Sequence, residues 1–527
     1  MRRRDVLKLS AGAAMLAAPP IARAQRERTL KFVPAGDLTL LDPVFTPIRG
    51  THNHAYLVFD TLYGLDETLT AQPQMVEGHN VESDGTIWTL RLREGLIFHD
   101  GTPVLARDAV ASIRRFGARD PFGQALMAVT NELSAPDDRN LRFRLTKPFP
   151  HLPAALAGSS TFTPCIMPER LADTEPSRQI TEMVGSGPYR FLPAEFSAGA
   201  RSVYERFATY VPRPEGTLSY SSGPKVTHFD RVEWQSVGDA ATAVAALLHG
   251  EVDWLDYVST DQVPAIAHSA DITVEVRDVL GSIPIMRFNQ LYPPFDNPAI
   301  RRALLGTVSQ ADVMNAVAGS DRASWHDRIG LFSPGSPMAN EAGIEALSSP
   351  REYDKVKRDL AEAGYRGEPI TVLAVSGNSL FEAVSAVGTD QLRKAGMNVD
   401  LQTMDMGTLF RRRTSKEPRE KGGWNVFFTF IDGMFSAGPA TNTFIRGNGK
   451  GALDGWPDSP KLEALRAAWL DTSDIDAQKQ ISQRMQLQLW RDVPYIPMGH
   501  FVRSTAHRRN IVDLPWGFAA FYGVRRV

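Results

Sequence analysis

Segments with strand periodicity and segments with helix signals alternate along the whole chain, and this alternation limits the folds open to it. Residues 87–93, 141–146 and 272–277 place apolar side chains at every second position, as half-buried strands do. The sequence has no internal repeat of roughly 20–50 residues, the mark of solenoids and propellers. At roughly 100–200 residues per domain, 527 residues predict two to four domains or lobes. We therefore expect an α/β protein of several lobes.

Helices are predicted by capping residues and by apolar stripes. Thr102-Pro103 and Ser459-Pro460 each combine a capping side chain with a proline suited to a first helical turn, so a helix is expected to begin at each. Ile481, Met485 and Leu489 recur every fourth position, which predicts a third helix with one apolar face. We interpret this stripe as core packing.

Composition excludes several classes of protein. Hydrophobic residues make up 43% and charged residues 22% of the chain, which suits large cores and argues against intrinsic disorder. The net charge of −2 lacks the basic excess of nucleic-acid-binding proteins, so no nucleic-acid partner is expected. The single cysteine, Cys165, leaves no disulfide framework and no cysteine-based zinc cluster. Nothing in the sequence compels oligomerisation, and we expect a monomer.

Residues 1–24 have the order of an export signal. A charged start containing Arg2, Arg3 and Arg4 precedes an apolar run, and Ala22-Arg23-Ala24 fits the cleavage pattern of small residues. The start also resembles the bacterial twin-arginine signal. The apolar run is shorter than the ~20 residues of a membrane-spanning helix, and no later stretch is long enough. We expect cleavage near Ala24 and a periplasmic protein that is not inserted in a membrane; a basic tail before a buried helix is the alternative.

Motifs for catalysis and cofactor binding are missing from the sequence. It contains no GxSxG turn, no HExxH helix, no GxxxxGK[ST] loop and no GxGxxG after a strand, so neither an enzyme nor a cofactor is expected. His52 and His54 are weak candidates for metal ligands, because on a strand their spacing would place both on one face. Protein metal sites usually take three or four ligands, so no metal site is predicted from this pair.

The most distinctive segment is residues 73–103, in which the turn dipeptides Asp84-Gly85 and Asp100-Gly101 bracket a strand. It closely resembles the signature of the solute-binding proteins that feed ABC importers for dipeptides, oligopeptides and nickel. Other landmarks of that family occur in the family's order: Leu41-Asp42-Pro43, 59–64, 185–189, 248–253, 288–289, 293–297, 301–303, 361–365 and 492–497. The resemblance covers essentially the whole chain after the export signal.

Resemblance to this family, the bacterial extracellular solute-binding proteins of family 5, implies a hinge-linked, two-lobed periplasmic-binding-protein fold similar to type 2. It implies a discontinuous first lobe, formed by residues 25–57, 186–281 and 496–527. An extra α/β subdomain, residues 58–185, is expected within this lobe, and residues 282–495 are expected to form the second lobe. Gly187-Pro188 and the segment from Pro494 to Pro497 are expected to mark points where the chain crosses between units.

The same resemblance implies a function without covalent chemistry. A solute that contacts both lobes only in the closed form shifts the population toward closure, and the permease of an ABC importer is expected to read the closed shape. The expected ligand is a peptide, a peptide-like compound or another small organic molecule. A carrier of nickel or haem on the same fold is the alternative, and a secreted hydrolase is a less favoured one.

Ligand-binding residues are implied on both sides of the cleft. In peptide-binding relatives an acidic residue of a second-lobe loop pairs with the ligand's amino terminus, but the matching Asp-Pro step here reads Gly438-Pro439. Asp432, six residues earlier, is the substitute, with a turn or capping role as the other interpretation. Arg446 favours an anionic ligand, because guanidinium binds carboxylate through paired hydrogen bonds, although a surface ion pair would also explain it. The remaining residues assigned to the cleft are Phe45, Thr46, Phe430, Phe435, Asn442 and Thr443.

Overall fold

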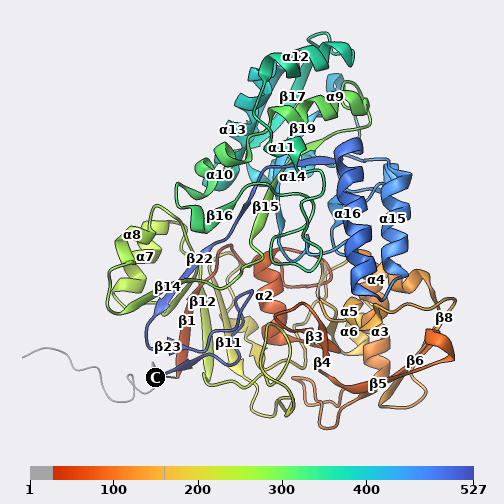
Figure 1. The fold of residues 1–527 in the computed structure, drawn as a ribbon. Coiled ribbons are helices and arrows are strands. Elements are labelled where there is room, and N and C mark those ends of the chain that lie inside the picture. Colours follow the sequence, from red (N-terminus) through yellow and green to blue (C-terminus); the bar gives the residue numbers. More distant parts are fainter. Residues whose placement is uncertain (1–27, 159–160) are drawn as a thin grey trace, which may run out of the picture.

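Two mixed sheets of seven strands each form the centres of two lobes in the computed structural model, which describes residues 28–158 and 161–527 (Figure 1). A third, four-stranded sheet with its own helices forms the extra subdomain. The predicted two-lobed α/β fold is therefore confirmed. The expected export signal lies outside the described residues. Within them, no helix combines the length and the apolar character needed to cross a membrane.

The first lobe is built on a sheet that takes strands from distant parts of the chain. Its elements are β1 (Thr29–Val33), α2 (Arg49–Val58), β10 (Tyr189–Phe191), β11 (Arg201–Arg206), β12 (Arg231–Gln235), α7 (Ala240–Leu248), β13 (Trp254–Val258), α8 (Val263–Ile266), β14 (Ile272–Val276), β22 (Ser504–Arg508), β23 (Ile511–Val512) and β24 (Arg525–Arg526). The sheet order is β10-β11-β12-β1-β13-β22-β14, with β1 parallel to both neighbours and β22 antiparallel to both of its own. The strand expected at 272–277 is confirmed as β14.

The extra subdomain packs its helices against an antiparallel sheet of order β5-β6-β8-β7. Its elements are β2 (Asp60–Thr61), β3 (Tyr63–Leu65), β4 (Ala71–Pro73), β5 (Val76–Glu82), β6 (Ile87–Leu92), α3 (Ala106–Gly117), α4 (Pro121–Ala128), β7 (Thr130–Ser134), β8 (Asn140–Leu145), α5 (Leu152–Ala155), β9 (Cys165–Ile166) and α6 (Glu169–Ala172). The strands predicted at 87–93 and 141–146 are confirmed as β6 and β8. The helix expected at Thr102-Pro103 instead begins at Ala106, because Pro103 forms a β-bridge with Ile97 and the Asp108 carboxylate binds the Leu105 N–H at 2.8 Å.

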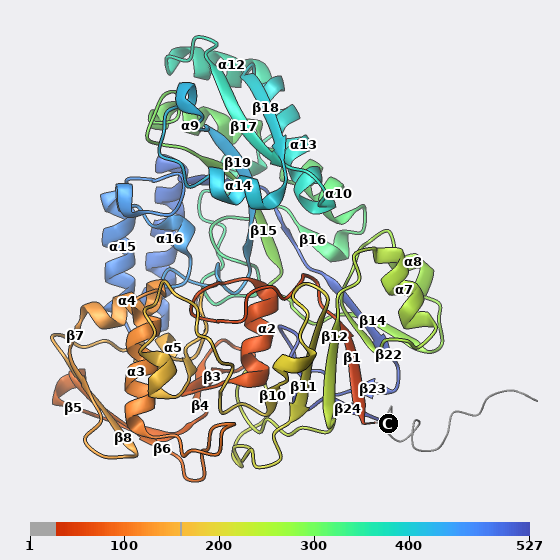
Figure 2. The same cartoon turned by 180° about the vertical axis from the view of Figure 1, so that it is seen from behind.

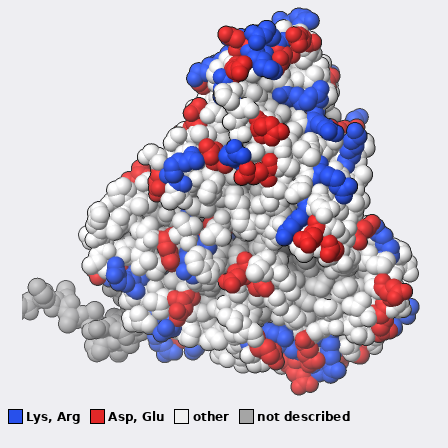
Figure 3. Space-filling model, viewed as in Figure 1, with Lys and Arg blue, Asp and Glu red and all other residues white. Residues whose placement is uncertain are grey.

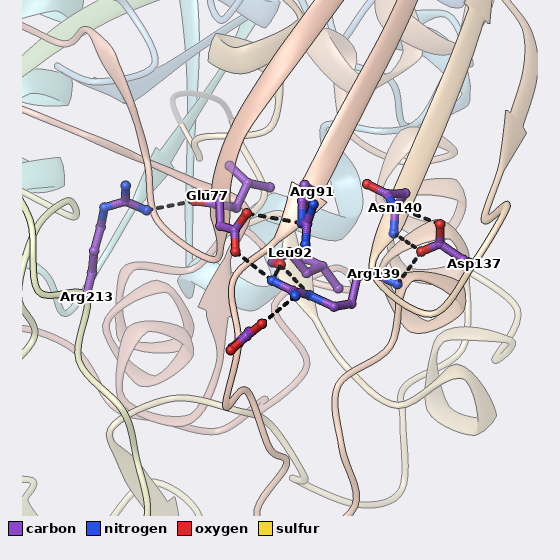
Figure 4. Close-up of polar contacts among 9 residues, drawn as sticks. Glu77, Arg91, Leu92, Asp137, Arg139, Asn140 and Arg213 are labelled. Atoms are coloured by element: carbon purple, nitrogen blue, oxygen red, sulfur yellow. Dashed lines mark hydrogen bonds and ion pairs between the residues drawn. The ribbon is translucent and has the colours of Figure 1, made fainter.

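Arg139 joins the loop before β8 to the neighbouring strands of the subdomain (Figure 4). Its guanidinium lies 2.6 Å from Glu77 Oε1 and 2.8 Å from Glu94 Oε1, and it also donates to the Leu92 carbonyl. Asp137 caps the same loop by accepting the backbone N–H of Arg139 and of Asn140, each at 2.9 Å. These contacts lie at the surface and bind groups of the subdomain to one another, so we assign them to local structure.

The second lobe surrounds a sheet of order β16-β21-β15-β19-β17-β18, with β20 also paired to β15. Its elements are β15 (Ser282–Phe288), α9 (Pro298–Ala303), α10 (Gln310–Ala318), β16 (Trp325–His326), α11 (Glu345–Ser348), α12 (Tyr353–Glu362), β17 (Pro369–Val375), α13 (Ser379–Lys394), β18 (Asn398–Met404), α14 (Met406–Arg412), β19 (Val426–Asp432), α15 (Pro460–Leu470), α16 (Ile475–Asp492), β20 (Tyr495–Pro497) and β21 (His500–Phe501). The helix predicted at Ser459-Pro460 is confirmed as α15, with Ser459 Oγ accepting the Leu462 N–H. The predicted apolar stripe lies on α16.

Two adjacent segments connect the lobes. The chain leaves β14 and enters β15 through residues 277–281, and it returns from β21 to β22 through Val502 and Arg503. The segments run side by side, because Ser282 pairs with Phe501 at one end and Val276 pairs with Ser504 at the other. β20 and β21 pair within the second sheet, so the return crossing lies after them and not at Pro494–Pro497, where the sequence pattern placed it.

The lobes also touch on the side away from these segments. Helices α15 and α16 extend from the second lobe toward α4 of the subdomain (Figures 1 and 2). There the His151 ring stacks on Trp469 with ring centroids 4.5 Å apart, and Lys147 Nζ lies 2.5 Å from Asp471 Oδ1. The structure thus has the two lobes in contact at both ends of their boundary.

Candidate functional site

A small pocket, with a cavity volume of about 30 Å³, lies where the connecting segments meet the first lobe. Ala35 and Trp254 come from the first lobe, and Ser282 begins the first strand of the second. The other residues that line the pocket are Arg49, Asp256, Tyr257, Arg277, Asp278, Gly281, Arg503, Thr505, Pro515, Gly517, Phe518 and Ala519. The pocket therefore combines aromatic walls with charges of both signs, a lining suited to a polar organic ligand.

Arg49 joins three parts of the molecule at this pocket. It is the first residue of α2, and its guanidinium lies 3.2 Å from Asp278 Oδ2 in the first connecting segment and 3.1 Å from Asp432 Oδ2 at the end of β19. Burial alone would lower the pKa of Arg49, but Asp256, Asp278 and Asp432 together raise it above its usual value. Burial and the charge of Asp432 raise the pKa of Asp278, and Arg49 opposes both effects. Arg49 is thus held as a cation that bridges the two lobes.

Arg277 is also neutralised by neighbouring groups. Its guanidinium lies 3.3 Å from Glu275 Oε1 and stacks over the Trp516 ring at 4.5 Å from the centroid. Glu275 in turn lies 3.1 Å from His507 Nε2. Hydrogen bonding to His507 and the charge of Arg277 outweigh the effect of burial, so the pKa of Glu275 lies below its usual value.

Arg503 differs from the other two arginines of the pocket. It lies on the second connecting segment, with its guanidinium 5.5 Å from the Tyr257 ring centroid and 5.4 Å from that of Phe501. Its Nε is buried and has no hydrogen-bond partner among the described residues. Burial and the charge of Arg49 lower its pKa. Asp256, on the same wall, accepts the Ala35 N–H at 3.2 Å.

Of the residues predicted for the cleft, Asp432 is the one that contacts the lining of this pocket through a salt bridge. Its two oxygens have different partners: Oδ2 binds Arg49, and Oδ1 accepts the Met434 N–H at 3.2 Å. It therefore carries an ion pair between the lobes together with the turn role that the sequence left open. Phe430 lies on the same strand with its ring 4.8 Å from that of Phe381, and Phe435 packs, half-buried, on the main apolar core.

The polar residues predicted after this loop have partners inside the second lobe. Asn442 is buried, accepts the Phe444 N–H and donates to Leu331 O and to the Tyr495 hydroxyl. Thr443 begins a short 3-10 helix, η6 (Thr443–Ile445).

Arg446 Nε lies 3.0 Å from Glu463 Oε1 on α15. The ion pair that the sequence analysis held as the other explanation of Arg446 is thus present, and it leaves the guanidinium already neutralised.

Phe45 and Thr46 lie in a turn next to the subdomain. Their backbone N–H groups bond to the Asp42 carbonyl at 3.1 and 3.3 Å, and Arg119 donates to the Phe45 carbonyl. Neither residue lines the pocket described above. The turn places Phe45 half-buried and Thr46 buried at the border between the first lobe and the subdomain.

The proposed pairing of His52 and His54 on one face is wrong, because the segment is helix α2 and not a strand. Residues two apart on a helix point to different sides. His54 is fully buried, and its Nδ1 lies 2.9 Å from the Tyr204 hydroxyl. His52 packs against Tyr56 and Phe518. Across the described ranges, no group of three or more His, Cys, Asp or Glu side chains is arranged to hold a metal ion.

Sequence reasoning missed the charged residues that line this pocket. Arg49, Asp256, Asp278 and Arg503 come from four separated segments, and none belongs to a recognisable motif. The one available signal was the position of Arg503, which directly follows segment 495–502, a stretch without Lys, Arg, Asp or Glu. On the face of the molecule drawn in Figure 3, acidic and basic side chains are interspersed, with both signs crowded at the tip over α12.

Comparison with known proteins gives a consistent result. Residues 70–452 match the family model of bacterial extracellular solute-binding proteins, family 5 Middle. The chain is 34% identical over 520 residues to the probable peptide ABC transporter periplasmic-binding protein y4tO of Sinorhizobium fredii, covering 97% of each protein. It is 24% identical over 513 residues to the glutathione-binding protein GsiB of Pectobacterium atrosepticum, covering 94% of this chain and 92% of that one.

Among solved structures, the fold is similar to that of the periplasmic binding protein DppA from Helicobacter pylori in complex with the peptide STSA. The TM-score is 0.78 at 18% identity, and the match covers 96% of this chain and 99% of DppA. At this identity the similarity establishes the arrangement of the lobes.

Proposed function

Because this chain belongs to family 5 of the bacterial extracellular solute-binding proteins, we propose that it captures a peptide or another small organic solute between its lobes for an ABC importer. The observation that carries the proposal is the pocket at the two connecting segments, where residues of both lobes meet. A solute seated there contacts both lobes only when they are closed, so its binding energy favours closure. The closed form is then the state that the permease receives.

Export to the periplasm and action as a monomer belong to the same proposal. Residues 1–24 support export through their charge and apolar pattern, and y4tO, which is similar over nearly the whole chain, is described as periplasmic. We infer binding without turnover, since enclosure between two lobes needs no nucleophile or general base.

The alternative of a nickel or haem carrier gains no support from the two histidines proposed for it. His54 is fully buried with one ring nitrogen bound to Tyr204, and burial lowers its pKa to about 3. His52 lies on another side of the same helix. Equilibrium dialysis against Ni²⁺ and absorbance spectra with haem are the measurements that would favour this alternative.

The test is titration calorimetry with Ser-Thr-Ser-Ala, glutathione and pools of di- to tetrapeptides, with small-angle scattering on the same samples. We expect saturable binding of at least one peptide, a smaller radius of gyration on binding, and recovery of that peptide intact by mass spectrometry. Cleavage of the peptide would contradict binding without turnover. No binding by any peptide, together with tight binding of Ni²⁺ or haem, would overturn the proposed ligand class.

A further inference from the structure

The three arginines of the pocket differ in how their charges are compensated. Arg49 pairs with Asp278 and Asp432, and Arg277 pairs with Glu275. Arg503 has neither an ion pair nor a hydrogen bond from its side chain to any described residue. Arg503 is half-buried, with its Nε fully buried, and even partial burial of a guanidinium without a partner is costly, because the group loses water and gains no hydrogen bonds in return. A partner from outside the protein would remove this cost.

The neighbours of Arg503 hold the guanidinium in place without neutralising it. The Tyr257 and Phe501 ring centroids lie 5.5 and 5.4 Å from its Cζ, within the range of cation–π contacts. The charges of Asp432 and Asp256 act to raise the pKa of Arg503, yet neither carboxylate forms an ion pair with it: Asp432 Oδ2 binds Arg49, and Asp256 Oδ2 accepts the Ala35 N–H. The positive charge of Arg49 lowers the pKa of Arg503.

We propose that Arg503 binds a carboxylate of the solute, which in a peptide is the terminal carboxylate. The inference rests on the proposed function and names the chemical class that the pocket selects. A guanidinium offers two parallel N–H donors that match the two oxygens of a carboxylate. Arg446, the arginine that the sequence favoured for an anionic ligand, pairs with Glu463, whereas Arg503 lines the pocket and has no ion partner among the described residues.

The position of Arg503 also connects this contact to the hinge. It is one of the two residues that join β21 of the second lobe to β22 of the first. A carboxylate bound there is held at the segment about which the lobes move.

The experiment compares the wild type with Arg503→Gln and with the control Arg509→Gln. Arg509 is exposed, lies six residues further along the chain, and its side chain has no partner among the described residues. The probes are two pools of di- to tetrapeptides built from Gly, Ala, Met and Leu, identical except that one has free and the other amidated C-termini. Calorimetry gives the affinities, and thermal unfolding without peptide gives the intrinsic stability.

For the wild type and Arg509→Gln we expect the free-acid pool to bind about ten- to a hundredfold more tightly than the amide pool, the range of a charge-assisted contact. For Arg503→Gln we expect the two pools to bind equally, at the level of the amide pool. Without peptide, the melting temperature of Arg503→Gln should equal or exceed that of the wild type, since the variant loses a half-buried charge that has no ion partner among the described residues. A purely structural arginine would lower it.

Two contrary results separate the role of Arg503 from peptide capture itself. Equal binding of the two pools by the wild type, or a free-acid preference that survives Arg503→Gln, overturns the role of Arg503 and leaves peptide capture intact. Absence of binding by either pool overturns peptide capture, and with it the role of Arg503 in binding a peptide carboxylate.

Discussion

The extra subdomain and the second lobe both border the first lobe, and charged side chains lie at both borders. At the subdomain border Arg115 binds Asp42 through two contacts of 3.0 and 2.7 Å, and both side chains are 1% exposed. Lys225 and Asp60 form a second pair at 2.7 Å, with 0% and 1% exposure. Asp42 also accepts the Val44 and Ile180 N–H groups, and Asp60 the Tyr210 hydroxyl.

The border with the second lobe has weaker and less complete pairing. Arg49 and Asp432 are each 30% exposed, and their 3.1 Å contact is open to water and salt. Arg503 has no ion partner there in the described parts of the chain. The first border is therefore the more tightly coupled of the two, because a buried charge that loses its partner is left without compensation in a medium that solvates it poorly. The second holds its parts by a more exposed ion pair, and its Arg503 is the charge for which we propose a ligand partner.

The largest expected effect is at the subdomain border. Replacing Asp42 with Ala strands the buried Arg115 charge, so we expect a loss of about 3–5 kcal/mol in the free energy of unfolding. Urea unfolding followed by circular dichroism measures it. Lys147→Ala, which removes an exposed ion pair between the lobes, is the control and should cost less than about 1 kcal/mol. Similar losses for the two variants would contradict the distinction between the borders.

A second prediction uses pH to compare two buried histidines. His99 at the subdomain border and His500 at the lobe border both have their pKa lowered by burial from 6.5 to about 4. The unfolded chain takes up these protons below about pH 6.5, whereas the folded protein resists them until about pH 4. Stability is therefore complete above pH 6.5 and falls as the pH drops toward 4, by up to about 3 kcal/mol for each histidine.

Unfolding free energies measured between pH 7 and pH 4 test this prediction. His99→Gln and His500→Gln should each show a shallower loss of stability with falling pH than the wild type. His249→Gln, at an exposed position, is the control. A pH dependence unchanged in both buried variants would exclude the two histidines as its source.

The third prediction concerns the close packing of the connecting segments. Gly281 has φ of +57°, and a Cβ there would lie 2.2 Å from the carbonyl oxygen of Phe501, the last residue of β21 before the other connecting segment. We expect Gly281→Ala to destabilise the protein by about 1–3 kcal/mol. Gly335→Ala is the matched control, because Gly335 also has positive φ, +81°, but no atom lies within 4 Å of the position that a Cβ would take there. If both variants lose the same stability, the backbone angle and not the contact is responsible.

The smallest effect on stability is expected for Asp432→Asn. Loss of the half-exposed pair with Arg49 should cost at most about 1 kcal/mol, since water already screens it. The same change removes an attraction between the lobes, so small-angle scattering without ligand should give a larger radius of gyration than the wild type. An unchanged radius would show that this ion pair does not favour closure.

The sequence by itself determined the local elements, the two-lobed class and the family. Strand periodicity at 87–93, 141–146 and 272–277 and the cap at Ser459 predicted elements that the structure contains, because these signals depend on neighbours along the chain. The landmark Leu41-Asp42-Pro43 was also recognised from sequence. Its physical role, a buried clamp on Arg115, was not, since that contact spans 73 positions.

Only the tertiary structure decided which polar and charged side chains have partners within the protein. From sequence, Arg446 and Asn442 were as available to a ligand as any other polar residue, yet Glu463 and Tyr495 bind them in the fold. Arg503 carried no motif, and it is the pocket arginine left without an ion partner among the described residues. Whether a charge is compensated depends on side chains that meet across hundreds of residues, and that pairing is set by packing and not by spacing along the chain.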